Sequence, residues 1–322
     1  MRIRGLALAA AGLLGIAGLS PAEAMDGVVA SIKPVHSLVA GVMKGTGVPG
    51  LIVDGAGSPH TYSLKPSQAR MLEHAKLVFW VGHDLEAFLE KPLETLGRDA
   101  EVVTLSQADG VKLLELREGG AFEAHEHGDG EDHAAGEDHD HEDYDHAGEG
   151  HDMHIWLDPH NAAAMVQLIA DALAKADPAN AAIYMSNADV LSVSLSRLED
   201  EIGEALAPVR ERPFVVFHDA YHYFEARFEM HAAGSVTVSP EVMPGAERIA
   251  EIRKKLSGLG GVCVFAEPQF EPKILAAVTE GTSAQSGTLD PLGASIADGP
   301  DLYFTLMRNM AAEMRGCLAG QG

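Results

Sequence analysis

Short β-rich runs alternate with longer amphipathic runs along this chain, and the alternation occurs twice. The strands expected in the first series are residues 28–32, 51–54, 77–81 and 102–105, and those in the second are 214–217, 235–238, 262–265 and 287–289. Helical spacing of apolar residues marks the connections, as in 36–44, 66–74, 245–256 and 272–279. Strands that alternate with helices form parallel sheets through right-handed crossovers, so each series predicts one α/β lobe.

A long helical segment, residues 178–207, separates the two series. Its apolar residues recur at spacings of three, four and seven, and no proline interrupts it after Ala179. About 30 helical residues would reach roughly 45 Å, which is longer than most helices inside one compact domain. We therefore expect a single connecting helix, with two helices separated by a turn as the alternative.

The predicted fold class is α/β: two (β/α)4-like lobes with parallel sheets, joined by one long rigid helix. Further helices are expected at 159–175 and 300–318. The predicted organisation is a signal peptide (1–24), an N-terminal lobe (25–177), the connecting helix (178–207) and a C-terminal lobe (208–322). Ligands of open parallel sheets bind beyond the carboxyl ends of the strands, so we expect the site in the cleft between the lobes.

A polar segment rich in His, Asp, Glu and Gly, residues 121–153, interrupts the N-terminal lobe. It contains no Lys or Arg and cannot bury a core, so disorder is expected. Imidazoles and carboxylates bind first-row transition metals, so the segment is interpreted as an auxiliary low-affinity metal loop. A purely solubilising role is the alternative. The histidines concerned are His125, His127, His133, His139, His141, His146 and His151.

The overall charge and the N-terminus indicate an exported protein that binds cations. A formal net charge of -25 argues against nucleic acid and anionic membranes as partners. Arg2 and Arg4 precede an apolar run, and Ala22 to Ala24 form a small-x-small cleavage site typical of a secretory signal. The apolar run is shorter than the roughly 20 residues that span a bilayer. We expect a soluble periplasmic protein, with an uncleaved anchor as the alternative.

The chain has two cysteines, Cys263 and Cys317. In an oxidising compartment a lone pair most simply forms one disulfide. A two-thiolate metal site is the alternative, although the CxxC spacing is missing.

Four candidate ligands lie just beyond expected strands or at the edge of the polar segment: His60, His154, His218 and Asp290. A lone histidine is more often a core or surface residue than a ligand. The three histidines are favoured as ligands because each lies where a cleft between two lobes would place it, and because the polar segment independently indicates metal. Asp290 has a second interpretation, as a turn former before Pro291.

No pattern in the sequence predicts an enzyme. His218 and His222 have the spacing of the HExxH motif of zinc proteases, but Asp219 replaces its glutamate and residues 214–217 are an expected strand. The nucleophile elbow, the P-loop and a GxGxxG after a strand are all missing.

Several motifs together resemble the zinc-specific solute-binding proteins of bacterial ABC importers, the ZnuA type. They are SPHTYSLKPSQ around His60, HIWLDPHNA around His154, FHDAYHYFE around His218, VFAEPQF after Cys263 and GTLDPLGA around Asp290. The resemblance covers essentially the whole mature chain, and the number and order of the motifs make it specific.

The resemblance implies two pseudo-symmetric lobes with Zn²⁺ held between them by His60, His154 and His218, and a disulfide between Cys263 and Cys317. It also implies delivery of the ion to a membrane permease powered by a separate ATPase. Some relatives carry a glutamate before the first histidine. Here that residue is Pro59, which leaves Asp290, water or a loop residue for the fourth position.

Zinc is favoured over harder metals by the expected donor set. Manganese and iron relatives pair two histidines with two carboxylates, whereas three imidazoles with at most one carboxylate suit the tetrahedral nitrogen site of zinc. The alternatives are a manganese or iron carrier of the same fold, and a periplasmic zinc buffer that serves no transporter. We expect a monomer.

Overall fold

The computed structural model describes residues 24–117, 150–237, 244–270 and 272–320. Its first half forms a four-stranded parallel sheet in the order β2-β1-β3-β4. The strands are β1 (Val28–Ile32), β2 (Gly50–Val53), β3 (Leu77–Trp80) and β4 (Glu101–Thr104), and the helices between them are α1 (Lys33–Val42), α2 (Pro66–Glu73) and α3 (Glu90–Thr95). Strands β1 and β3 are buried throughout, which explains why every residue in them except Ser31 is apolar.

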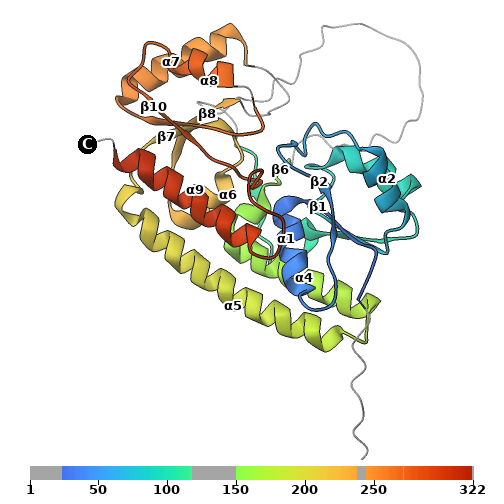
Figure 1. The fold of residues 1–322 in the computed structure, drawn as a ribbon. Helices are drawn as coiled ribbons and strands as arrows, with labels where there is room; N and C mark the ends of the chain where they lie inside the picture. The colour runs from blue at the N-terminus through green and yellow to red at the C-terminus, as the bar shows by residue number, and fades with distance from the viewer. Residues whose placement is uncertain (1–23, 118–149, 238–243, 271, 321–322) are drawn as a thin grey trace, which may run out of the picture.

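The second half repeats this topology. Its sheet has the order β10-β9-β7-β8, and all neighbours are parallel. The strands are β7 (Phe214–His218), β8 (Ala232–Thr237), β9 (Cys263–Ala266) and β10 (Gln285–Thr288), and the helices are α6 (His222–Phe228), α7 (Ala246–Leu259) and α8 (Pro272–Thr279). Numbered within its own half, each sheet has the order 2-1-3-4. The two lobes predicted from the alternating pattern are therefore confirmed (Figure 1).

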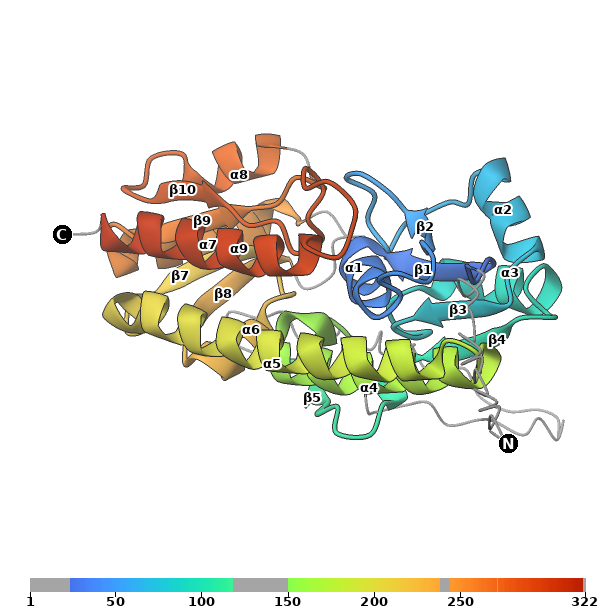
Figure 2. The ribbon, with the colours of Figure 1, turned by 60° about the horizontal axis from the view of Figure 1, so that its bottom comes forward.

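The three longest helices that the structure describes are α4 (Pro159–Ala176), α5 (Ala181–Leu206) and α9 (Leu302–Ala319). Helix α5 is continuous over 26 residues, roughly 39 Å, so the alternative of two helices is wrong. It packs against α1, α4 and α9, and Figure 2 shows it running past both lobes. The largest group of buried apolar residues contains members from both halves of the chain, so the lobes share one core.

A short antiparallel hairpin corrects the expected boundary of the polar segment. Strand β5 (Leu114–Glu115) pairs with β6 (His151–Asp152), and Asp152 and Met153 are buried. Disorder was expected up to residue 153. The two strands lie on either side of the polar segment, so their pairing is invisible to a local sequence window. Residues 1–23 of the expected signal peptide (1–24) lie outside the described residues, as do His125, His127, His133, His139, His141 and His146.

Cys263 at the start of β9 is bonded to Cys317 in α9 by a disulfide, with the two Cα atoms 6.1 Å apart. The predicted pairing is confirmed, and the two-thiolate metal site is excluded.

Among the helices that the structure describes, none has the length and apolar character needed to cross a membrane.

Glu86 is a buried carboxyl group just beyond β3. The backbone N–H groups of Val81 and Gly82 donate to its Oε2, each at 2.9 Å. Burial raises its pKa to about 7, against the lowering effect of hydrogen bonds from Ser31, Gly82 and Val81. A folded pKa above the unfolded value means that the folded state retains a proton that the unfolded state has released. Stability from this group therefore falls as pH rises from about 4.5 to about 7.

Glu86→Gln should remove this pH dependence because glutamine carries no titrating proton. Between pH 5 and pH 8, we expect the stability of the variant relative to the parent to increase by roughly 2–3 kcal/mol. Urea denaturation at both pH values measures the difference. An identical difference at the two pH values would contradict the raised pKa.

Candidate metal centre

Three histidines from distant parts of the sequence meet between the lobes. His60 lies in the loop after β2, His154 lies two residues beyond the end of β6, and His218 is the last residue of β7. The Nε2 atom of His154 lies 3.3 Å from Nε2 of His60 and 3.3 Å from Nε2 of His218. The three ligand atoms all lie within 4.8 Å of one another. The structure therefore brings together the three histidines predicted from the sequence.

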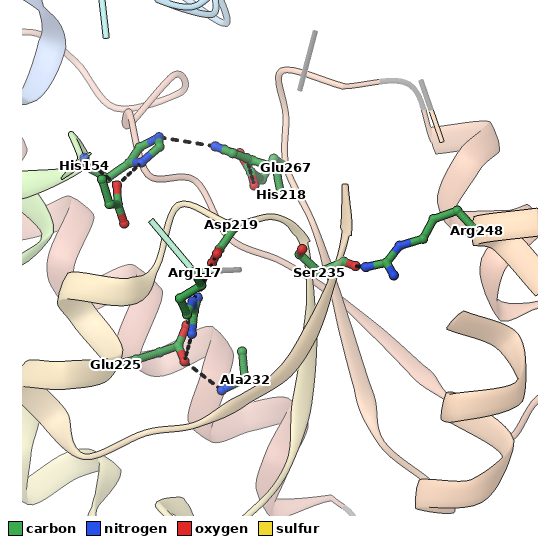
Figure 3. A network of polar contacts seen from close by, with 10 residues as sticks. Arg117, His154, His218, Asp219, Glu225, Ala232, Ser235, Arg248 and Glu267 are labelled. Carbon is green, nitrogen blue, oxygen red and sulfur yellow. Dashed lines mark hydrogen bonds and ion pairs between the residues drawn. The ribbon is translucent and has the colours of Figure 1, made fainter. Parts of the chain in front are cut away.

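Two carboxylates fix the orientation of two of these rings. Asp152 Oδ1 accepts a hydrogen bond from Nδ1 of His154 at 2.7 Å. Glu267 Oε1 accepts one from Nδ1 of His218 at 2.6 Å (Figure 3). A carboxylate can only accept, so it holds the ring proton on Nδ1 and leaves the lone pair of Nε2 unprotonated in the neutral ring. The Nε2 atoms of His154 and His218 therefore present two lone pairs to each other.

The spacing of these nitrogen atoms suits one shared cation. Zinc binds histidine nitrogen at about 2.0–2.1 Å, and tetrahedral geometry then places two such nitrogens about 3.3 Å apart. Two facing lone pairs repel each other unless a cation or proton lies between them. The arrangement therefore has the chemistry of a metal site with three neutral nitrogen donors.

Sheet topology explains why Glu267 reaches His218. His218 ends β7, Glu267 follows β9, and these strands are neighbours in the second sheet. The strand order reverses between them, and ligands of open parallel sheets bind at such a switch point.

The sequence analysis assigned no role to Glu267 or Asp152. The signals were present, since Glu267 lies just beyond an expected strand and Asp152 precedes His154 by two residues.

The surroundings of the site shift the pKa values of His60 and His218 in opposite directions. Burial, followed by the charges of His154 and His218, lowers the pKa of His60 well below its ordinary value. Burial also acts to lower the pKa of His218, but the Glu267 carboxylate outweighs burial and raises it. His60 is therefore neutral over a wider pH range than His218.

A small cavity of about 10 Å³, enough for a single small species, adjoins the histidines. It is lined by Ser58, Pro59, His60, His154, Trp156, His218, Glu267, Gln269, Phe270, Pro291 and Leu292. Both lobes contribute to this lining, which places the site in the cleft expected from the fold.

Asp290 does not join the three histidines. Its Oδ1 accepts hydrogen bonds from Nε2 of Gln269 at 3.2 Å and from the backbone N–H of Leu292 at 3.3 Å. It lines a separate cavity of about 360 Å³. The bond to the backbone two residues ahead is that of an Asx turn, so the structure places Asp290 as the turn former that was the alternative interpretation.

His222 does not share a helical face with His218. His218 ends β7 and His222 begins α6, and only His218 belongs to the group of converging ligand atoms. The zinc-protease motif requires both histidines on one helix, so this geometry does not support it.

A family model and similar proteins with assigned names both concern zinc uptake. Residues 28–317 match the family model described as "Zinc-uptake complex component A periplasmic". A protein of Brucella suis named "High-affinity zinc uptake system protein ZnuA" is 52% identical and covers 98% of this chain and 99% of its own length. A Yersinia pestis protein of the same name is 38% identical, with 90% and 91% covered.

Solved structures share the fold at lower identity. A structure titled "Crystal structure of ZnuA" matches with a TM-score of 0.73 and 24% identity, covering 92% of this chain and 100% of its own. A Pseudomonas aeruginosa solute-binding protein, FpvC, solved with Mn²⁺, also gives a TM-score of 0.73, at 17% identity, with 92% and 99% covered. At these identities the two matches show that the chain shares their fold.

Proposed function

This chain belongs to the ZnuA family of periplasmic zinc-uptake components, and on that premise we propose that it captures Zn²⁺ between its lobes and delivers it to an ABC permease. A separate ATPase would power the permease. Zinc is the cargo of such a protein and is released unchanged. The function is that of a carrier in transport.

The convergence of three imidazole nitrogens is the observation that carries the proposal. We assign His60, His154 and His218 as the zinc ligands and water to the fourth position. Three neutral nitrogens suit zinc, whereas manganese prefers a harder, oxygen-rich set. Asp152 and Glu267 support the proposal because carboxylates that accept the second N–H of a ligating histidine fix its orientation and raise its basicity.

Growth under zinc limitation tests the proposed function directly. A strain that lacks this protein should grow poorly in medium with a zinc chelator, and added zinc should restore growth. The wild-type chain should also restore growth, and a variant with all three histidines replaced by alanine should not. If the wild-type chain restores growth in a strain that also lacks the permease, the protein is a zinc buffer.

We further propose that the histidine-rich segment 121–153 supplies weak auxiliary zinc sites next to His154. The proposal rests on its composition, which combines many imidazoles and carboxylates without a basic residue. Deleting residues 123–149 leaves β6 in place and should leave one tight site while abolishing several weak ones in calorimetry. Loss of the tight site would refute this division of roles.

Zinc affinity should fall as pH decreases, and His218 should control the fall. Its pKa is raised, so below that pKa zinc must displace a proton, which lowers the affinity by about tenfold per pH unit. His60 adds nothing near neutrality because its pKa is lowered well below the ordinary value. Competition with a chelator between pH 8 and 5.5 measures the slope.

Glu267→Gln is the control for this pH dependence. The variant lacks the charge that raises the pKa of His218, so its fall in affinity should begin at lower pH. A dissociation constant that stays constant from pH 8 to 5.5 would contradict ligation by His218.

A further inference from the structure

Arg117 forms two forked ion pairs beneath the three-histidine site. Its Nε donates to Asp219 Oδ2 at 3.0 Å and its Nη2 donates to Asp219 Oδ1. Its Nη1 and Nη2 donate to the two carboxylate oxygens of Glu225 at 2.8 and 2.9 Å. Figure 3 shows the guanidinium lying between the two carboxylates. One side chain from the first half of the chain therefore binds two acidic side chains of the second half.

These ion pairs are largely shielded from water. The exposed fractions of the side chains are 18% for Arg117, 6% for Asp219 and 4% for Glu225. Burial acts to lower the pKa of Arg117, but the hydrogen bonds that it donates to the Glu225 and Asp219 carboxylates outweigh burial and raise it, so Arg117 is always charged. Removing the guanidinium would leave two buried carboxylates without their main counter-charge, which is strongly unfavourable.

The Arg117 ion pairs connect the segments that carry two of the histidines. Asp219 directly follows His218 in the turn beyond β7. Arg117 follows β5, which pairs with β6, where Asp152 orients His154. Tyr223 strengthens the connection, because its hydroxyl donates to the backbone oxygen of Asp152 at 2.6 Å and accepts from the backbone N–H of Leu114 at 2.9 Å.

We propose that Arg117 is a positioning residue for zinc binding. By holding the His218–Asp219 turn against the β5–β6 hairpin, it keeps Nε2 of His154 and Nε2 of His218 at the separation that one ion requires before the ion arrives. The inference rests on the proposed function, because it assumes that the two histidines share an ion. Without the guanidinium, part of the free energy of zinc binding would be used to bring His154 and His218 together, and the affinity would fall.

Arg117→Gln should raise the zinc dissociation constant by about 10–100-fold, the usual effect of removing a group that orients metal ligands. Titration with zinc chloride against a competing chelator measures the affinity, and circular dichroism reports whether the protein is folded. Arg117→Lys keeps the charge but cannot form the two bidentate ion pairs. This variant should therefore fold and have a zinc affinity between those of the parent and Arg117→Gln. The lysine variant therefore tests the proposal even if Arg117→Gln does not fold.

Arg227→Gln is the matched control. Arg227 also binds two carboxylates, Asp158 and Glu199, and connects α6 to the first half of the chain, but neither carboxylate lies in the turn that carries His218. This variant should lose stability and keep the zinc affinity of the parent.

Two results would overturn the inference. One is an unchanged affinity in folded Arg117→Gln or Arg117→Lys, and the other is an equal loss in Arg227→Gln. Failure of the proposed function would look different, because the wild-type protein itself would then lack a tight zinc site.

Discussion

His218→Ala is expected to weaken zinc binding by roughly 10²–10³-fold. Structural zinc sites with four ligands bind with about 10–16 kcal/mol, which amounts to about 2.5–4 kcal/mol per ligand. Water can replace the imidazole but binds zinc less strongly. The substitution also removes the partner of Glu267, whose side chain is 1% exposed, so a buried carboxylate would remain uncompensated. Competition titration with a chelator of known affinity measures the loss.

His60→Ala and His154→Ala should cause losses of the same order, because each removes one of the three converging nitrogens. His222→Ala is the matched control, since His222 lies four residues after His218 and outside this group. We expect its affinity to remain within about threefold of the parent. An equal loss at His222 would revive the paired-histidine interpretation and contradict the assigned site.

The second large effect is expected from the disulfide. Replacing Cys263 and Cys317 together with serine should lower the free energy of unfolding by about 4 kcal/mol, the chain-entropy estimate for a loop closed over a sequence separation of 54. The disulfide ties β9 of the second sheet to α9, which packs against α1 and α5. Urea denaturation of the parent and the double variant measures the difference.

Zinc affinity should be nearly unchanged in the folded double variant. Cys263 begins β9, whereas Glu267 follows the other end of this strand and orients His218. The disulfide and the metal centre therefore lie at opposite ends of one strand. A large loss of affinity would show that the disulfide positions Glu267, which this geometry does not predict.

The sequence predicted the lobes well because each depends on local patterns. Residues 28–32 and 214–217 are apolar enough to be buried strands, and helices follow both. The three histidines were also predictable, since each lies near the carboxyl end of an expected strand or at the edge of the polar segment. The disulfide followed from the presence of only two cysteines.

Other features of the site depend on contacts between distant residues. Arg117 reaches Asp219 and Glu225 across more than a hundred residues of chain. Strands β5 and β6 pair although the polar segment separates them in the sequence, and the composition of that segment gives no sign of the pairing. Asp290 looked equally suited to a turn or to a ligand, and only the positions of Gln269 and Leu292 distinguished the two.

The sequence by itself determined which donors the chain carries and that two similar parallel sheets would hold them, because hydrophobic periodicity and residue chemistry are local properties. The tertiary structure decided which donors meet and what orients them. The 3.3 Å distance between Nε2 of His154 and Nε2 of His218 arises only when the two lobes pack against each other. The Glu267 carboxylate reaches Nδ1 of His218 only because β7 and β9 pair in one sheet. Such packing is a property of the whole chain, and no local pattern encodes it.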